Sequence, residues 1–140
     1  MARDPARVQH RLGRVATACG LGVVALASTV LIGWFLGIPD LTWLHPSFAA
    51  MRPNTAVSFL LAGMAVAALP SSRGRPWGAI VLALAGTFSI LNVIYLVEWT
   101  TGWDPGIDTV LAPFITEIGG RQFRTSPTSS GCFVVMGVAM

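Results

Sequence analysis

Charged side chains are scarce in this chain of 140 residues. They make up 11% of the sequence, against about a quarter in a typical soluble domain, while hydrophobic residues make up 54%. Lysine is absent, so arginine alone supplies the nine basic residues that oppose six acidic ones. This composition excludes an ordinary soluble domain and predicts a single domain in a lipid bilayer. The net charge of +3 is small, and we interpret it as a membrane-orientation signal and not as a nucleic-acid footprint.

Cysteine and histidine are also rare, with two of each. Two cysteines cannot form a disulfide framework, and we expect Cys19 and Cys132 to be buried, inert and too far apart to pair. His10 and His45 are expected on opposite sides of the membrane, which excludes a metal or haem site that uses both.

No group of residues predicts catalysis. Residues 20–25 fit the dinucleotide pattern G-x-G-x-x-A, but they lie inside an uncharged span and do not follow a strand. Asp104 and Asp108 flank a Pro-Gly turn, yet two carboxylates fall short of the roughly six to eight oxygens of a calcium site. We therefore expect no enzyme, no cofactor and no metal in this chain.

Long uncharged runs predict an all-α integral membrane protein. The run of 24 residues from 15 to 38 exceeds, at about 1.5 Å per residue, a hydrocarbon core of about 30 Å. The predicted transmembrane helices span about 15–38, 53–71, 77–98 and 127–140. They leave a basic segment at 1–14, a membrane domain at 15–140, and outer loops at 39–52 and 99–126. The fourth helix is short and stops within an apolar run, so we predict that it is truncated.

Arginine placement predicts the orientation, because short cytoplasmic segments of membrane proteins are enriched in basic residues. Six of the nine arginines precede the first helix or follow the second, namely Arg3, Arg7, Arg11, Arg14, Arg73 and Arg75. We therefore place the N-terminus in the cytoplasm and both long loops outside a bacterial inner membrane. If a helix begins at Pro5, three of these arginines form a stripe suited to anionic headgroups. Ordinary positive-inside flanking is the simpler interpretation.

The chain contains an internal repeat, since residues 51–63 align with residues 125–137. Trp34 to Ile38 likewise correspond to Trp103 to Ile107. Each half is then a helix, an outer loop and a returning helix, which predicts a four-transmembrane-helix bundle built from two duplicated hairpins.

Small residues on shared helix faces predict where these helices pack. Phe59 and Gly63, like Phe133 and Gly137, are four residues apart, and glycine lets two backbones approach closely. The predicted packing positions are Gly33, Gly37, Phe59, Gly63, Ala67, Phe133 and Gly137. They favour a tight bundle, and they leave dimerisation open.

The repeated pattern resembles a known family. Met-x-Pro-Asn-Thr-Ala with Phe-Leu-Leu-x-Gly at residues 51–63, after Trp-x-x-Gly-Ile at residues 34–38, is similar to the N-terminal membrane regions of bacterial sensor histidine kinases and related diguanylate cyclases. The likeness runs from about Val15 onward, and the second copy departs from it at residues 126–129. The resemblance implies a completed fourth helix followed by a cytoplasmic kinase or cyclase module. Either the chain is a fragment of such a protein, or it is a shortened relative with another task.

Aromatic and polar residues near the predicted outer boundary form the candidate ligand or partner surface. They are Trp34, Asp40, Trp43, His45, Asn92, Tyr95, Trp99, Trp103, Asp104 and Asp108. For the tryptophans we favour an aromatic belt, and the alternative is a pocket formed by loops over the bundle mouth. Asn92, Tyr95 and Trp99 are expected to point the same way, with Asn92 in an interhelical hydrogen bond. Glu98 is expected to reach water.

Two functions fit these expectations. The first is a membrane-embedded sensory or regulatory module of a bacterial signalling protein, which passes a signal to a cytoplasmic output through the fourth helix. The second is a small accessory subunit of a larger respiratory or photosynthetic membrane complex. The expected partners are the lipid bilayer and either further copies of the chain or a larger membrane protein, without nucleic acid.

Overall fold

The computed structural model describes residues 5–43, 50–72, 75–103, 106 and 126–139. These residues form four α-helices and two short 3-10 helices, and no strand occurs among them. In chain order the elements are α1 (Pro5–Leu36), η1 (Pro39–Thr42), α2 (Pro53–Ala68), η2 (Leu69–Ser71), α3 (Arg75–Thr101) and α4 (Pro127–Ala139).

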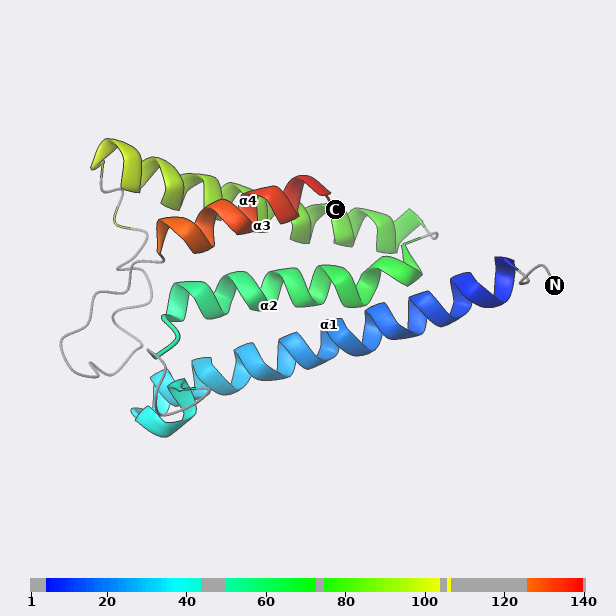
Figure 1. Ribbon diagram of the computed structural model, residues 1–140, viewed down its shortest axis with the longest axis horizontal. Helices are drawn as coiled ribbons and strands as arrows, with labels where there is room; N and C mark the ends of the chain where they lie inside the picture. Colours follow the sequence, from blue (N-terminus) through cyan, green and yellow to red (C-terminus); the bar gives the residue numbers. More distant parts are fainter. Residues whose placement is uncertain (1–4, 44–49, 73–74, 104–105, 107–125, 140) are drawn as a thin grey trace.

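The four helices lie alongside one another with alternating direction (Figure 1). At one end, here called the loop end, α1 and α3 finish and α2 and α4 begin. At the opposite end, the arginine end, α1 begins and η2 leads from α2 towards α3. The main packing contacts join α1 to α2, α2 to α3 and α3 to α4.

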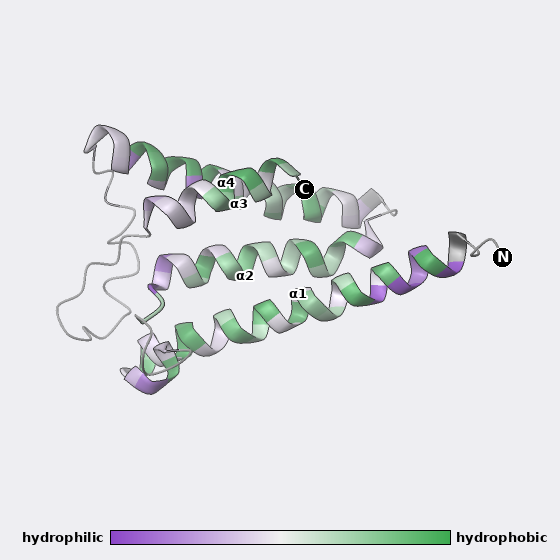
Figure 2. Ribbon diagram, viewed as in Figure 1, coloured by the Kyte–Doolittle hydropathy of each residue, from purple (hydrophilic) through white to green (hydrophobic). Residues whose placement is uncertain are grey.

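Three of these helices are long and apolar enough to cross a membrane. The spans are Arg7–Leu36, Pro53–Ser71 and Pro76–Thr101, whereas Pro127–Ala139 is a shorter apolar helix. Figure 2 shows that hydrophilic residues gather at the helix ends, most clearly in the first turns of α1. The uncharged runs of the sequence therefore do form apolar helices, although the fourth is below spanning length.

Helix α1 begins at Pro5, so most of the predicted separate basic segment is the start of this helix. Proline suits a first helical turn because its missing N–H has no intrahelical partner there. The helix ends at Leu36, and the φ of 66° at the following Gly37 lies in the left-handed region. The Ile38 N–H donates to the Gly33 carbonyl at 2.8 Å, which is the Schellman arrangement of a helix end. Pro39 then begins η1.

Glycines bring α1 and α2 into backbone contact. A Cβ built on Gly20 would lie 2.6 Å from the Ala67 nitrogen and 2.7 Å from the Gly63 carbonyl oxygen. A Cβ on Gly63 would lie 2.9 Å from the Gly20 carbonyl oxygen, whereas Gly22 has open space around it. The predicted packing role of Gly63 and Ala67 is therefore realised against Gly20, which sequence analysis singled out only for its accidental dinucleotide pattern.

The two phenylalanines of the repeat meet between α2 and α4. The Phe59 and Phe133 rings are 4.9 Å apart at 88°, and Phe88 of α3 lies 5.5 Å from Phe133 at 71°. These edge-to-face contacts add specific attraction to the burial of the rings. A Cβ on Gly137 would collide with Ser89 of α3, so this glycine also serves a close helix contact.

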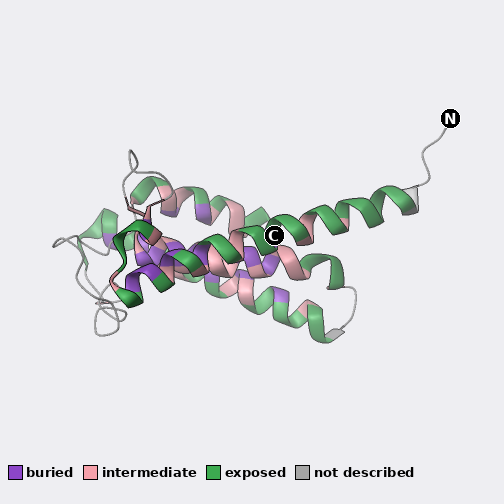
Figure 3. Ribbon diagram, turned by 90° about the horizontal axis from the view of Figure 1, so that it is seen from below, coloured by how far each residue is buried: buried purple, intermediate pink, exposed green. Residues whose placement is uncertain are grey.

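Two predicted packing glycines remain: Gly37 forms the left-handed end of α1 described above, and Gly33 packs locally, since a Cβ there would lie 2.6 Å from the Leu41 Cβ of η1. Gly33 thus lets η1 fold back against the end of α1. Buried residues concentrate towards the loop end, and most residues in the first half of α1 are exposed (Figure 3). Cys19 and Cys132 are free and exposed, so the prediction that they are buried is wrong for the isolated chain.

Candidate functional site: a polar layer at the loop end

Asn92 of α3 joins α2 through a buried hydrogen bond. Its Nδ2 donates to the Ser58 Oγ at 3.2 Å and to the Phe88 carbonyl at 2.9 Å. Asn92 is fully buried and Ser58 is 1% exposed. The interhelical hydrogen bond expected for Asn92 is confirmed, with Ser58 as a partner that sequence analysis did not identify.

Further buried polar side chains lie between this hydrogen bond and the loop end. Asn54 is one turn before Ser58 on α2, and Glu98 is six residues after Asn92 on the antiparallel α3. Ser130 lies in the first turn of α4, one turn before Phe133. We call Asn54, Ser58, Asn92, Glu98 and Ser130 the polar layer. It places polar groups from three helices at one end of the molecule.

Glu98 is the one residue of this layer that carries a formal charge when ionised. It is 2% exposed, so the expectation that it reaches water is wrong. Its carboxyl group therefore lies inside the protein and not at the membrane–water boundary.

The face of α3 that bears the layer is continuous. Its buried positions, spaced three or four residues apart, are Val81, Ala85, Phe88, Asn92, Tyr95 and Glu98. Trp99 shares the helical phase of Asn92 but is 45% exposed. The prediction that Asn92, Tyr95 and Trp99 form one face is therefore only partly right, because Glu98 replaces Trp99 as the last buried position.

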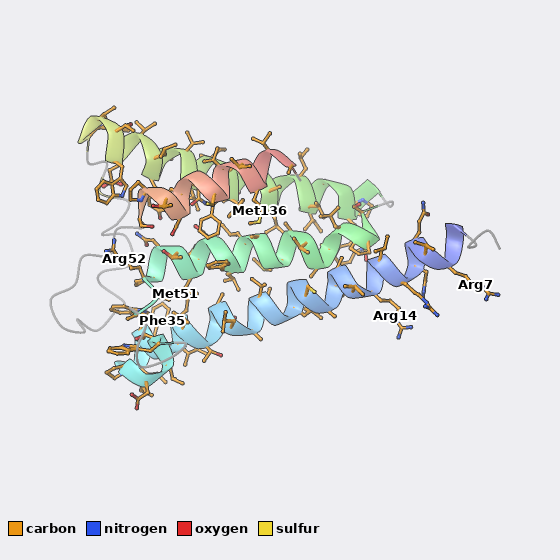
Figure 4. All side chains as sticks on the ribbon, viewed as in Figure 1. Arg7, Arg14, Phe35, Met51, Arg52 and Met136 are labelled. Carbon is orange, nitrogen blue, oxygen red and sulfur yellow. The ribbon has the colours of Figure 1, made fainter. Side chains whose placement is uncertain are left out.

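An apolar cluster of phenylalanines lies next to the polar layer. Ala62, Phe88 and Phe133 are buried together, and Phe59, Leu61 and Met136 pack against them. Figure 4 shows Met136 of α4 on the side of that helix towards α2. Ser130, one turn before Phe133 on α4, has no exposed surface. Its Oγ has no hydrogen-bond partner within the described part of the chain. A buried hydroxyl of this kind is a site for a bound water or a polar ligand atom.

The predicted outer tryptophans divide into two groups. Trp34 is 3% exposed, packs with Val30 and Ala56, and donates its Nε1–H to the Met51 carbonyl at 2.9 Å. Trp34 is therefore a core residue that ties the end of α1 to the start of α2. Trp99 and Trp103 are 45% and 61% exposed, as an aromatic belt requires.

The other candidate residues do not join the polar layer. Asp40 is exposed in η1, and Trp43 is half-buried directly after it. Tyr95 is buried on the face of α3 described above. His45, Asp104 and Asp108 lie outside the described residues. Within the described ranges, no group of three or more His, Cys, Asp or Glu side chains could hold a metal ion.

Sequence reasoning missed most of the polar layer. Asn54 stood within the repeated motif, and Ser58 follows it at the i+4 spacing that puts both on one face. Glu98 and Ser130 carried no local signal, because their burial depends on which helices pack beside them.

No protein-family model, curated protein or solved structure matches this chain.

Proposed function

We propose that this chain is the membrane-embedded sensory or regulatory module of a bacterial signalling protein. In this proposal the helices form a four-helix bundle of two duplicated hairpins in the inner membrane, with the arginine end in the cytoplasm. The loop end then receives the signal, and α4 passes it to a cytoplasmic output. The observation that carries the proposal is the polar layer, in which a buried hydrogen bond joins α2 to α3 and α4 contributes the buried Ser130, at the end proposed to face outward.

Polar side chains in this position are expensive in a membrane protein and usually have a function. Hydrogen bonds between transmembrane helices contribute only about 0.6 kcal/mol on average. The Ser58–Asn92 hydrogen bond therefore holds α2 and α3 in one arrangement by a small energy. A change of charge at Glu98 or of hydration at Ser130 would change the free energy of this arrangement by at least as much and would shift it.

Helix α4 is the element best suited to respond. Its buried residues are Ser130 and Phe133, while Val135 and Val138 are 72% and 84% exposed. Its packing contacts are mainly with α3 and only slightly with α2, so α4 can move without disturbing the α1–α2 pair. By contrast, the backbone contact at Gly20 makes the α1–α2 pair a rigid base.

The duplicated-hairpin part of the proposal gains support from the phenylalanine pair. Phe59 and Phe133 occupy equivalent positions in the repeat, and their rings touch. Contact between equivalent residues is what a pseudo-twofold axis between two hairpins would produce. The resemblance to sensor kinases and cyclases points to the same arrangement.

The native cysteines allow a direct test of the coupling. Cys19 on α1 and Cys132 on α4 are both exposed, so both can carry spin labels without mutation. In the protein reconstituted into vesicles, Asn92→Leu should change the distance distribution between the labels. Thr87→Leu, at an exposed position on the same helix, is the matched control and should leave it unchanged. An identical distribution for all three proteins would contradict coupling between the layer and α4.

The signalling role itself is tested on the full-length gene product. Asn92→Leu should change the phosphotransfer or cyclase rate of its cytoplasmic domain in vesicles, and Thr87→Leu should not. A gene product that has no cytoplasmic output domain, or that purifies in fixed stoichiometry with a larger membrane complex, would refute this role and favour the accessory subunit.

A further inference from the structure

A groove lies at the arginine end, away from the polar layer. It has a volume of about 1000 Å³ and is bordered by the first half of α1 and by η2 with Ser72. Along the groove α1 packs closely on η2 and α2: a Cβ on Gly13 would lie 3.3 Å from the Pro70 Cβ of η2, and the Thr17 Oγ donates to the Ala67 carbonyl of α2 at 3.4 Å. Small-molecule binding sites in proteins usually have volumes of roughly 300–1000 Å³, so this groove is at the upper end of that range.

The lining changes character along the helix axis. Gln9, His10 and Arg14 line the groove near the start of α1, whereas Leu21 lines it deeper along α1 and Leu69 lines it from η2. Seven residues separate Arg14 from Leu21, which is about 10 Å of helix. The charged and large polar lining groups of α1 thus lie towards its start, with Leu12 among them, and the α1 lining from Ala16 to Leu21 is apolar except for Thr17. This change occurs on the length scale of a lipid headgroup and the first part of its acyl chain.

The charge at this end is almost entirely positive. The sequence contains no acidic residue between positions 5 and 39 or between positions 41 and 97. Arg7, Arg11 and Arg14 follow one another at helical spacing on α1, at the end opposite Arg52 (Figure 4). Arg14 has no ion-pair partner within the described residues. An anionic group is the complementary occupant.

The expected depth in a bilayer fits the same occupant. The uncharged run starts at Val15, so Arg14 is the last charged residue before the hydrocarbon core, and Leu21 lies inside it. The helix extends outward from there to Pro5. Headgroup phosphates occupy the level of Arg14, and acyl chains occupy the level of Leu21.

We propose that this groove binds an anionic phospholipid. The phosphate is held by the Arg14 guanidinium with His10 beside it, and one acyl chain lies along Leu21 and Leu69. The inference rests on the membrane setting of the proposed function and is independent of its sensory role.

The test measures retained lipid on the full chain. The protein is purified in mild detergent, supplied with equal amounts of phosphatidylglycerol and phosphatidylcholine, and analysed by native mass spectrometry. We expect one phosphatidylglycerol to be retained preferentially. Arg14→Gln should weaken this binding at least about tenfold, because a charge-assisted hydrogen bond is lost. Arg11→Gln removes the same charge beside the groove and should cost about fivefold or less, as for a general surface charge.

A second pair of variants tests the acyl-chain part of the groove. Ala18 lines the groove and Ala25 does not, although both are exposed on α1. Ala18→Phe should displace the lipid, while Ala25→Phe should leave it bound. Inorganic phosphate should not compete at millimolar concentration, since it lacks the acyl chain.

The outcomes separate the two proposals. Equal losses for Arg14→Gln and Arg11→Gln, equal retention of both lipids, or full competition by inorganic phosphate would overturn the lipid site and leave the sensory module intact. A chain that stays soluble without detergent would overturn both.

Discussion

The contact between Gly20 and α2 gives a prediction whose size can be worked out. In Gly20→Ala, the new Cβ would lie 2.6 Å from the Ala67 nitrogen, whereas ordinary contact begins at 3.4 Å. The two backbones must therefore separate by 3.4 − 2.6 = 0.8 Å, because neither backbone can turn aside as a flexible side chain would. Overpacking of this kind costs about 1–3 kcal/mol.

Gly22→Ala is the matched control, since a Cβ at Gly22 meets nothing within 4 Å. Both variants gain the same helix propensity, up to about 1 kcal/mol, so this gain cancels in the comparison. The difference between the two variants should then equal the overpacking cost, about 1–3 kcal/mol. Reversible unfolding by SDS in mixed micelles, followed by tryptophan fluorescence and circular dichroism, measures it. Equal stabilities for the two variants would refute the backbone contact.

Three further predictions concern the loop end. Trp34→Phe should lower the free energy of unfolding by about 1 kcal/mol, because the hydrogen bond to the Met51 carbonyl is lost. Trp99→Phe should change the same free energy by less than about 0.5 kcal/mol. Chemical unfolding followed by circular dichroism measures both, and equal effects would contradict the core position of Trp34. A double-mutant cycle of Ser58→Ala and Asn92→Leu should give a coupling of about 0.6–1.7 kcal/mol, and additive effects would show that the hydrogen bond does not form. Phe133→Leu should lower the free energy of unfolding by about 0.5–1.5 kcal/mol, because the contacts with the Phe59 and Phe88 rings are lost. The α1–α2 pair should stay assembled in this variant, which disulfide trapping of cysteines introduced into α1 and α2 can check.

The positions of the helices could be predicted from the sequence because the signal is local. Uncharged runs of spanning length, Pro53 and Pro127 at helix starts, and the i, i+4 pairs of phenylalanine and glycine all lie within one helix. The start of α1 at Pro5 was harder to predict, because arginine is unfavourable in the hydrocarbon core but is compatible with an α-helix. Charge therefore marks the predicted membrane boundary and not the end of the helix.

The polar layer could not be predicted, because burial depends on contacts between helices. Gly20 and Gly22 are equivalent in sequence, yet only one faces α2. Glu98 looks like a boundary residue, and only the packing around the end of α3 shows that it is buried. Trp34 and Trp99 are both boundary tryptophans by position, and their different exposure follows from the Met51 segment that covers the first.

The membrane topology is tested most directly by cysteine labelling on intact cells. Cys19→Ser and Cys132→Ser remove the native thiols, after which His10→Cys reports the arginine end and Asp40→Cys reports the loop end, both at exposed positions. A membrane-impermeant thiol reagent applied to spheroplasts should label Asp40→Cys at once and His10→Cys only after lysis. Labelling of both before lysis, or of His10→Cys alone, would contradict the proposed arrangement.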